Sequence, residues 1–287
     1  MAFSERRYTA QDGLSLYFRD YGAEHRAKTP VLCLAGLTRN SNDFSRLAEQ
    51  LSSDRRVICP DYRGRGKSEY DSEWRNYTPF TYINDIRHLI IFLNIYRVFV
   101  IGTSMGGLIT MGMGAAMPTV LAGALINDVG PVIEKHGLDK ILTYMQEGAS
   151  GFNDWGAAAA YLRDRFPELP AETDEDWLWI ARGTFQEGMG GRIEHNWDYN
   201  LIRPILNDTE AAELWPLFQT LKRIPLVVTR GGISDILSAA TLDAMVAAIP
   251  ELTAVTVDGV GHMPNLMEPE CQEVLHDALA HADDAHH

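Results

Sequence analysis

Nine consecutive residues govern how this chain can be organised: Val98-Phe99-Val100-Ile101-Gly102-Thr103-Ser104-Met105-Gly106. Because the first four are all apolar, they are typical of a strand buried on both faces inside a parallel sheet. Mostly small residues follow Gly106 up to Met117 and predict a helix, so the chain has to turn sharply at Ser104. Glycine at positions 102 and 106 leaves room for that turn. The stretch therefore predicts a strand–turn–helix unit with a serine hydroxyl at the carboxyl end of the strand.

Similar apolar runs recur along the chain, at residues 30–36, 56–61, 122–126, 225–229 and 252–257. Helically spaced apolar residues separate them, at residues 43–51, 82–93, 238–249 and 269–280. Strands that alternate with helices form a parallel sheet. Near the N-terminus, Asp12-Gly13 between two patterned runs predicts an antiparallel hairpin. We therefore expect an α/β fold with a mostly parallel eight-stranded sheet and helices on both faces.

The alternation stops between residues 131 and 216. This segment has no clear apolar strand-like run, and it holds five of the six tryptophans. We expect residues 1–130 and 217–287 to form the core, and residues 131–216 to form a helical cap inserted over one end of the sheet. The large side chains of this segment either line an apolar pocket or pack it onto the core; they are Tyr144, Phe152, Trp155, Trp177, Trp179, Phe185, Met189, Trp197 and Trp215.

Composition excludes several kinds of partner. The chain of 287 residues is 46 % hydrophobic and 22 % charged, which is ordinary for a globular protein. Its net charge of −14 disfavours nucleic acid and anionic membrane surfaces as partners. No stretch is apolar over the roughly 18 residues that a bilayer requires. We therefore expect a small-molecule substrate, neither nucleic acid nor a membrane as partner, and a monomer or homodimer.

The cysteines indicate the compartment. Three of them, Cys33, Cys59 and Cys271, form an odd and sparse set without the spacing of a disulfide framework. The N-terminus shows no signal-peptide pattern. Both observations favour reduced thiols and a cytoplasmic protein.

A serine hydroxyl needs a base to become a nucleophile, and the base needs an acid to orient it. His262 is the candidate base, because it lies on a glycine-containing loop just after the last predicted strand. The other eight histidines lie in predicted helices, in the insert, near the termini or in an early loop.

Two aspartates compete for the role of the orienting acid. Asp235 follows the predicted strand at residues 225–229, and Asp128 follows the one at residues 122–126. Either side chain would lie at the carboxyl edge of the sheet. We favour Asp235, because it lies on the later strand and gives the chain order expected after a nucleophile elbow; Asp128 remains the alternative.

Several motifs resemble those of the α/β-hydrolase fold family. The order Ser104, Asp235, His262 is that family's order, and residues 61–68 resemble its D-x-R-G-x-G-x-S segment. Ala35-Gly36-Leu37 is similar to its His-Gly-x oxyanion loop, with alanine in place of histidine. Gly261-His262 followed by Pro264 resembles its histidine loop. The resemblance covers the chain except for the insert, which would be the family's variable cap.

The resemblance implies acyl transfer without metal or cofactor. Ser104 would attack a carbonyl carbon, and the N–H groups of Leu37 and Met105 would bind the oxyanion. A serine at the elbow separates this chain from the epoxide hydrolases and haloalkane dehalogenases of the fold, which use aspartate. We expect a serine hydrolase acting on an ester, lactone or related carbonyl substrate through an acyl-enzyme. The alternatives are a C–C bond hydrolase, a cofactor-free haloperoxidase or perhydrolase, and a non-catalytic ligand-binding protein of this fold.

Overall fold

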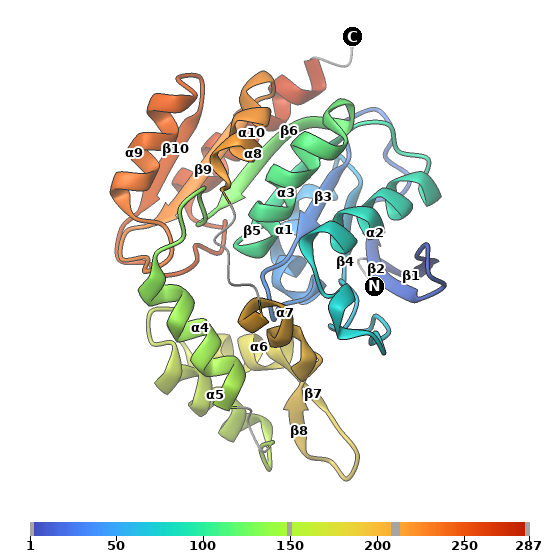
Figure 1. The fold of residues 1–287 in the computed structure, drawn as a ribbon, viewed down its shortest axis with the longest axis vertical. Coiled ribbons are helices and arrows are strands. Elements are labelled where there is room, and N and C mark those ends of the chain that lie inside the picture. The colour runs from blue at the N-terminus through green and yellow to red at the C-terminus, as the bar shows by residue number, and fades with distance from the viewer. Residues whose placement is uncertain (1–2, 148–150, 208–212, 285–287) are drawn as a thin grey trace.

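An eight-stranded sheet organises the computed structural model, which describes residues 3–147, 151–207 and 213–284. The strand order is β1-β2-β4-β3-β5-β6-β9-β10 (Figure 1). β1 runs antiparallel to β2, β2 runs antiparallel to β4, and the remaining neighbours are parallel. The predicted mostly parallel α/β sheet is therefore confirmed. The strands are β1 (Phe3–Thr9), β2 (Ser15–Tyr21), β3 (Val31–Leu34), β4 (Val57–Pro60), β5 (Val98–Thr103), β6 (Leu121–Asn127), β9 (Leu226–Gly231) and β10 (Thr253–Val257).

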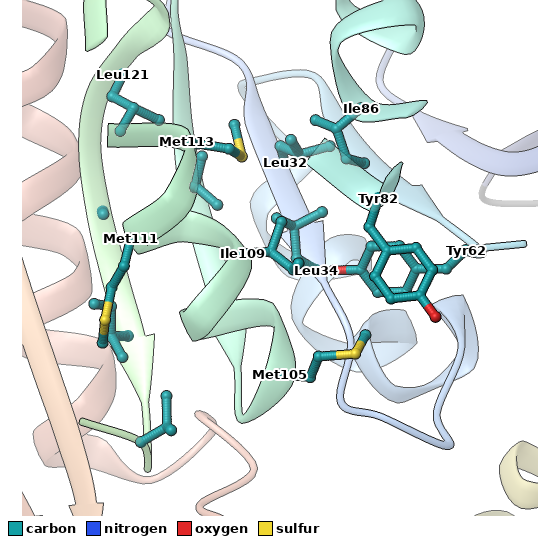
Figure 2. Close-up of a cluster of buried hydrophobic side chains, with 14 of the residues drawn as sticks. Leu32, Leu34, Tyr62, Tyr82, Ile86, Met105, Ile109, Met111, Met113 and Leu121 are labelled. Carbon is teal, nitrogen blue, oxygen red and sulfur yellow. The ribbon is translucent and has the colours of Figure 1, made fainter. Parts of the chain in front are cut away.

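Helices cover both faces of the sheet. One face packs against α2 (Pro79–Phe92), α3 (Met105–Ala116), α8 (Trp215–Gln219) and α9 (Ala239–Ala248). The other packs against α1 (Ser45–Leu51) and α10 (Pro269–Asp284). Side chains alternate between these two cores along each strand, so Leu32 and Leu34 lie in the first core while Val31 and Cys33 lie in the second. Figure 2 shows Leu32 and Leu34 beside Ile109 of α3.

Side chains of small polar residues define where several helices begin. Thr78 precedes α2 and accepts a hydrogen bond from the backbone N–H of Thr81, while Pro79 supplies the first helical residue. Ser238 caps α9 in the same way. Short 3₁₀ turns complete the connections: η1 (Ser41–Phe44), η2 (Trp74–Asn76), η3 (Pro118–Val120), η4 (Tyr199–Leu201) and η5 (Thr220–Arg223).

The insert, residues 131–216, lies at one end of the sheet (Figure 1). Its helices are α4 (Lys135–Glu147), α5 (Trp155–Arg165), α6 (Asp174–Thr184), α7 (Ile202–Asn207) and the start of α8. It is mostly helical, as expected, and α5 and α6 share a small apolar core with Phe185 and Ile193. It also contains a two-stranded hairpin, β7 (Phe185–Glu187) and β8 (Ile193–His195). Strands of three residues are too short to give a recognisable apolar run, which is why the sequence did not predict them.

No helix within the described ranges combines the length and the apolar composition needed to cross a bilayer.

Candidate active site

The turn at Ser104 is as tight as the sequence predicts. Ser104 has φ 52° and ψ −117°, a backbone conformation that a residue with a side chain adopts only under strain. A Cβ atom on Gly102 would lie 2.4 Å from the carbonyl oxygen of Gly106, and one on Gly106 would lie 2.0 Å from that of Leu34. Only glycine fits at either position. The pair of glycines thus places Ser104 between β5 and α3.

Ser104 and His262 come together across the carboxyl edge of the sheet. Nε2 of His262 lies 3.0 Å from Oγ of Ser104. His262 follows β10, and the side-chain amide of Asn127 fixes its loop by donating a 2.9 Å hydrogen bond to the carbonyl oxygen of Pro264. The structure therefore brings Ser104 and His262, the expected nucleophile and base, within hydrogen-bonding distance of each other.

Asp128, not Asp235, contacts the imidazole. Oδ2 of Asp128 lies 2.6 Å from Nδ1 of His262. The Asp128 side chain is fully buried and also accepts hydrogen bonds from the backbone N–H of Gly231 at 2.8 Å and from the hydroxyl of Ser234 at 2.6 Å. A carboxylate held by two donors in addition to the imidazole has a fixed orientation.

Asp235 lies near Lys140 and not near His262, so the expectation that Asp235 is the orienting acid is corrected. Its Oδ2 lies 3.6 Å from Nζ of Lys140 on α4, and its side chain is about a quarter exposed. The physical reason lies in the sheet order: β6 is the direct neighbour of β5, whereas β9 is one strand further away. From the loop after β9, the residue that reaches Asp128 is Ser234.

Both predicted oxyanion donors border Ser104. Leu37 follows β3 and lines the same cavity as Ser104, and a Cβ on neighbouring Gly36 would lie 3.7 Å from the Cβ of Ser104. Met105 is the first residue of α3, where backbone N–H groups have no acceptor within the helix. The helix N-terminus also favours negative charge at this point.

A cavity of about 190 Å³ opens over Ser104 and His262. The core contributes Leu37, Phe44 and Leu47, and the histidine loop contributes Met263, Leu266 and Met267. The insert supplies the other wall with Ile141, Tyr144, Leu162, Phe166, Leu169, Trp179 and Ile180. The walls are thus mainly apolar, which is typical of small-molecule sites.

The large side chains of the insert divide between the cavity wall, internal packing and solvent. Trp155 and Trp177 belong to the small core of the insert, while Trp197 and Trp215 pack with the first core. Tyr144 and Trp179 line the cavity, whereas the rings of Phe152 and Phe185 pack edge to face within the insert, with 5.0 Å between their centres. Met189 is almost fully exposed. Phe166 also lines the cavity, although no pattern in the sequence distinguishes it from other residues of the insert.

Charges at the cavity wall are paired or suppressed. The Arg39 guanidinium forms two hydrogen bonds with Asp43, at 2.8 and 2.6 Å, and another with the hydroxyl of Thr184. Burial alone would lower the pKa of Arg39, but the Asp43 carboxylate outweighs it and the pKa is raised. Burial raises the pKa of Tyr144, so its hydroxyl stays neutral. The Arg39 cation at the cavity wall is thus neutralised by Asp43, and Tyr144 carries no charge.

No group of three or more His, Cys, Asp or Glu side chains is arranged to hold a metal ion within residues 3–147, 151–207 and 213–284.

Comparisons with known proteins match this fold. Residues 31–276 match the family model described as "Alpha/beta hydrolase family". The chain is 33 % identical over 249 residues to 3-hydroxybutyrate-oligomer hydrolase of Cupriavidus necator, covering 83 % of this chain and 84 % of the relative. It is 29 % identical over 249 residues to 2-(acetamidomethylene)succinate hydrolase of Mesorhizobium japonicum, covering 84 % of each. A solved α/β hydrolase from Novosphingobium aromaticivorans superposes with a TM-score of 0.91 at 40 % identity, over 98 % of this chain and 99 % of that one.

Proposed function

Because the chain belongs to the alpha/beta hydrolase family and is a hydrolase, we propose that it hydrolyses carboxylic esters through an acyl-enzyme on Ser104. The hydrogen-bonded sequence Ser104–His262–Asp128 carries the proposal, with 3.0 Å between Oγ and Nε2 and 2.6 Å between Nδ1 and Oδ2. These distances fit a nucleophile, a base and an orienting acid acting as a catalytic triad.

The reaction follows from this geometry. His262 accepts the Ser104 proton while Oγ attacks the ester carbonyl carbon, and the N–H groups of Leu37 and Met105 bind the resulting oxyanion. When the intermediate collapses, His262 returns the proton to the leaving alcohol. A water molecule, deprotonated by His262, then attacks the acyl-enzyme. When this second intermediate collapses, His262 gives the proton to Oγ of Ser104 and the acid is released. Asp128 holds the imidazole orientation and stabilises its positive charge in both steps.

The cavity limits the substrate. Its volume of about 190 Å³ is smaller than the roughly 300–1,000 Å³ of sites for drug-sized ligands, and its walls are mainly apolar. A short acyl chain fits this description. The relative named 3-hydroxybutyrate-oligomer hydrolase supports short esters of hydroxy acids as the first class to test.

A second candidate reaction comes from the other relative. 2-(Acetamidomethylene)succinate hydrolase is similar over 84 % of this chain, so hydrolysis of a related non-ester substrate, including C–C bond hydrolysis, belongs in the same assays. Haloperoxidase or perhydrolase activity shares the serine mechanism and is assayed by adding peroxide.

Cellular context follows from charge and cysteines. We propose a cytoplasmic enzyme, monomeric or homodimeric, with a small-molecule substrate and neither nucleic acid nor a membrane as partner. The net charge of −14 supports this proposal. So do Cys33, Cys59 and Cys271, which are free thiols buried in the second core.

The test compares wild type with Ser104→Ala. The substrates are p-nitrophenyl esters of increasing acyl length, linear 3-hydroxybutyrate dimers and trimers, a lactone, and 2-(acetamidomethylene)succinate. We expect wild type to prefer short esters, and Ser104→Ala to lose about 10³-fold or more in kcat. A fluorophosphonate should label wild type and not the variant. Full ester hydrolysis by folded Ser104→Ala would contradict the proposal.

A further inference from the structure

Arg65 contacts both residues that supply the proposed oxyanion donors. Its side chain is fully buried in the segment after β4. Nε donates a hydrogen bond to the carbonyl oxygen of Leu37, and Nη2 lies 3.7 Å from Sδ of Met105. The remaining contacts are with the carbonyl oxygen of Arg63 at 3.0 Å and the hydroxyl of Tyr82 at 3.1 Å. One side chain thus joins the segments that follow β3 and β4 to α2 and α3.

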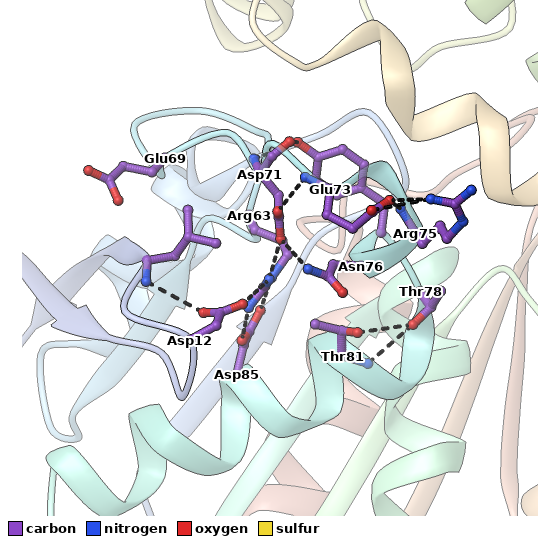
Figure 3. A network of polar contacts seen from close by, with 12 residues as sticks. Asp12, Arg63, Glu69, Asp71, Glu73, Arg75, Asn76, Thr78, Thr81 and Asp85 are labelled. Atoms are coloured by element: carbon purple, nitrogen blue, oxygen red, sulfur yellow. Dashed lines mark hydrogen bonds and ion pairs between the residues drawn. The ribbon is translucent and has the colours of Figure 1, made fainter.

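The environment of this guanidinium differs from that of its neighbour Arg63. Arg63 forms ion pairs with Asp12, Asp71 and Asp85 (Figure 3). In the described part of the chain Arg65 forms no ion pair; backbone carbonyls, a sulfur and two aromatic rings surround it. A buried cation without a carboxylate partner costs folding energy. Its N–H groups therefore act as donors to the backbone carbonyl oxygens of Leu37 and Arg63.

Two neighbouring tyrosine rings, 5.1 Å apart, lie beside the guanidinium of Arg65. The guanidinium carbon of Arg65 lies 4.9 Å from the ring centre of Tyr82 and 5.4 Å from that of Tyr62. Figure 2 shows these two rings next to each other, with Met105 close by. A planar guanidinium packs better against aromatic rings than an ammonium group does.

The segment that carries Arg65 also fixes the far end of the Leu37 loop. Oδ1 of Asp61 accepts the backbone N–H of Ser41 at 2.7 Å, while Oδ2 accepts that of Lys67 at 2.8 Å. A Cβ on Gly66 would lie 2.1 Å from Oδ2 of Asp61, so this contact depends on glycine. The loop that presents Leu37 is therefore held at two points, Leu37 and Ser41.

The opposite side of the Arg65 segment pairs with the insert. The backbone N–H of Gly66 donates to the carbonyl oxygen of Asn196 at 3.0 Å, and that of Asp198 donates to the carbonyl oxygen of Gly64 at 2.8 Å. Arg65 and Trp197 form the β-bridge between these bonds. Arg65 thus lies between the insert and the Leu37 loop.

We propose that Arg65 is a positioning residue that orients the oxyanion donors of Leu37 and Met105 and connects them to the insert. This inference rests on the proposed function of the same site. Because loss of one oxyanion donor costs about 10²–10³ in kcat, incomplete orientation of Leu37 should lower kcat while leaving KM nearly unchanged.

The test uses two substitutions of Arg65 and a matched control. Arg65→Lys keeps the charge but loses the planar guanidinium, so we expect kcat to fall about 10- to 100-fold, with KM within about threefold of wild type. Arg65→Met should lower kcat further, because it removes both the charge and the donors. The pH profile of kcat/KM should keep its shape, because His262 is untouched. The rate of fluorophosphonate labelling should fall in parallel, since that adduct also places an oxygen at the donors.

Arg63→Lys is the control, because it alters a buried arginine two residues away whose partners are carboxylates. It should lower the unfolding temperature with little effect on kcat per folded molecule. Equal kcat losses in Arg63→Lys and Arg65→Lys would overturn the inference, as would folded Arg65 variants with kcat within twofold of wild type.

A milder variant decides the matter if the Arg65 variants do not fold. Tyr82→Phe removes the hydroxyl that accepts from Nη2, and we expect a drop of about threefold in kcat with KM unchanged. Wild-type kcat in Tyr82→Phe would then overturn the inference. Retained activity in Ser104→Ala would defeat the proposed function, whereas an inactive Ser104→Ala with unaffected Arg65 or Tyr82 variants would defeat this inference alone.

Discussion

The carboxylate of Asp128 lies 2.6 Å from Nδ1 of His262, although 134 residues separate the two in the chain. Asp128→Asn should therefore lower kcat by about 10³- to 10⁴-fold, because the amide no longer fixes the imidazole tautomer. Asp235→Asn is the matched control, and it should stay within a few-fold of wild type. The measurement is ester hydrolysis by the two purified variants. An inactive Asp235→Asn beside an active Asp128→Asn would show that Asp235 is the acid after all.

Ser234 is expected to support the acid. Its hydroxyl donates a 2.6 Å hydrogen bond to Asp128 and accepts from the backbone N–H of Ile236 at 3.1 Å. Ser234→Ala should lower kcat about 3- to 30-fold without raising KM, at a cost of roughly 1–2 kcal/mol in stability. Ser238→Ala, which removes the cap of α9, should cost about 1 kcal/mol and leave kcat unchanged. Steady-state kinetics and urea unfolding of both variants separate the two roles; equal kcat in both would contradict a role for Ser234.

Lys140 joins the insert to the core. Its ammonium group contacts Glu168 in the insert and lies 3.6 Å from Asp235 after β9. Glu168 also accepts a backbone hydrogen bond from Gly261 through its carbonyl oxygen, at 3.3 Å. Lys140→Met should loosen this wall of the cavity and raise KM for the longer esters by about 3- to 10-fold, with a smaller effect on acetate esters.

Lys135→Met is the control for that variant. Lys135 lies on the same helix, is largely exposed and pairs with Asp139. A surface pair of this kind contributes about 0–1 kcal/mol, so its loss should leave KM unchanged. Similar KM values in both variants would show that the Lys140 contacts do not shape the cavity.

His195 should make stability depend on pH. Burial lowers the pKa of His195 to about 4, so between about pH 6.5 and 4 the unfolded state binds a proton that the folded state does not. Stability from this group is therefore complete above pH 6.5 and is lost as the pH falls towards 4, by up to roughly 3 kcal/mol.

Urea unfolding across that pH range tests the prediction. His195→Gln should show a shallower loss of stability than wild type between pH 6.5 and 4, whatever its absolute stability. His276→Gln changes an exposed histidine and should keep the wild-type slope. Parallel curves for wild type and His195→Gln would contradict the assignment.

Local pattern predicted the sheet, Ser104 and His262. Runs apolar on both faces identify buried strands, and Gly102 and Gly106 identify the turn, because these signals depend on neighbours in the chain. The choice between Asp128 and Asp235 depends on which strand lies beside β5, which is a matter of tertiary order. Chain order alone favours the aspartate that does not contact His262.

The cavity was equally hidden from the sequence. Tyr144 and Phe152 are both aromatic residues of the insert, and the sequence does not distinguish them. Tyr144 lines the cavity, whereas Phe152 packs against Phe185 within the insert. The sequence does not distinguish Arg65 beyond its place in residues 61–68, because the residues that it contacts, Leu37 and Met105, are 28 and 40 residues away in the chain.

The hydrogen bonds that Asp128 accepts have a consequence for engineering. Asp128 lies just before the insert, and its donors Gly231 and Ser234 lie after the insert, at the end of β9 and beyond. The chain therefore leaves the sheet and returns to it at two points that are hydrogen-bonded to each other. A foreign segment in place of residues 131–216 would leave Ser104, Asp128 and His262 with the donors of Asp128, but it would remove the backbone hydrogen bonds that join Asn196 and Asp198 to the Arg65 segment. Such a segment would therefore have to supply both a new cavity wall and a new contact for Gly64 and Gly66.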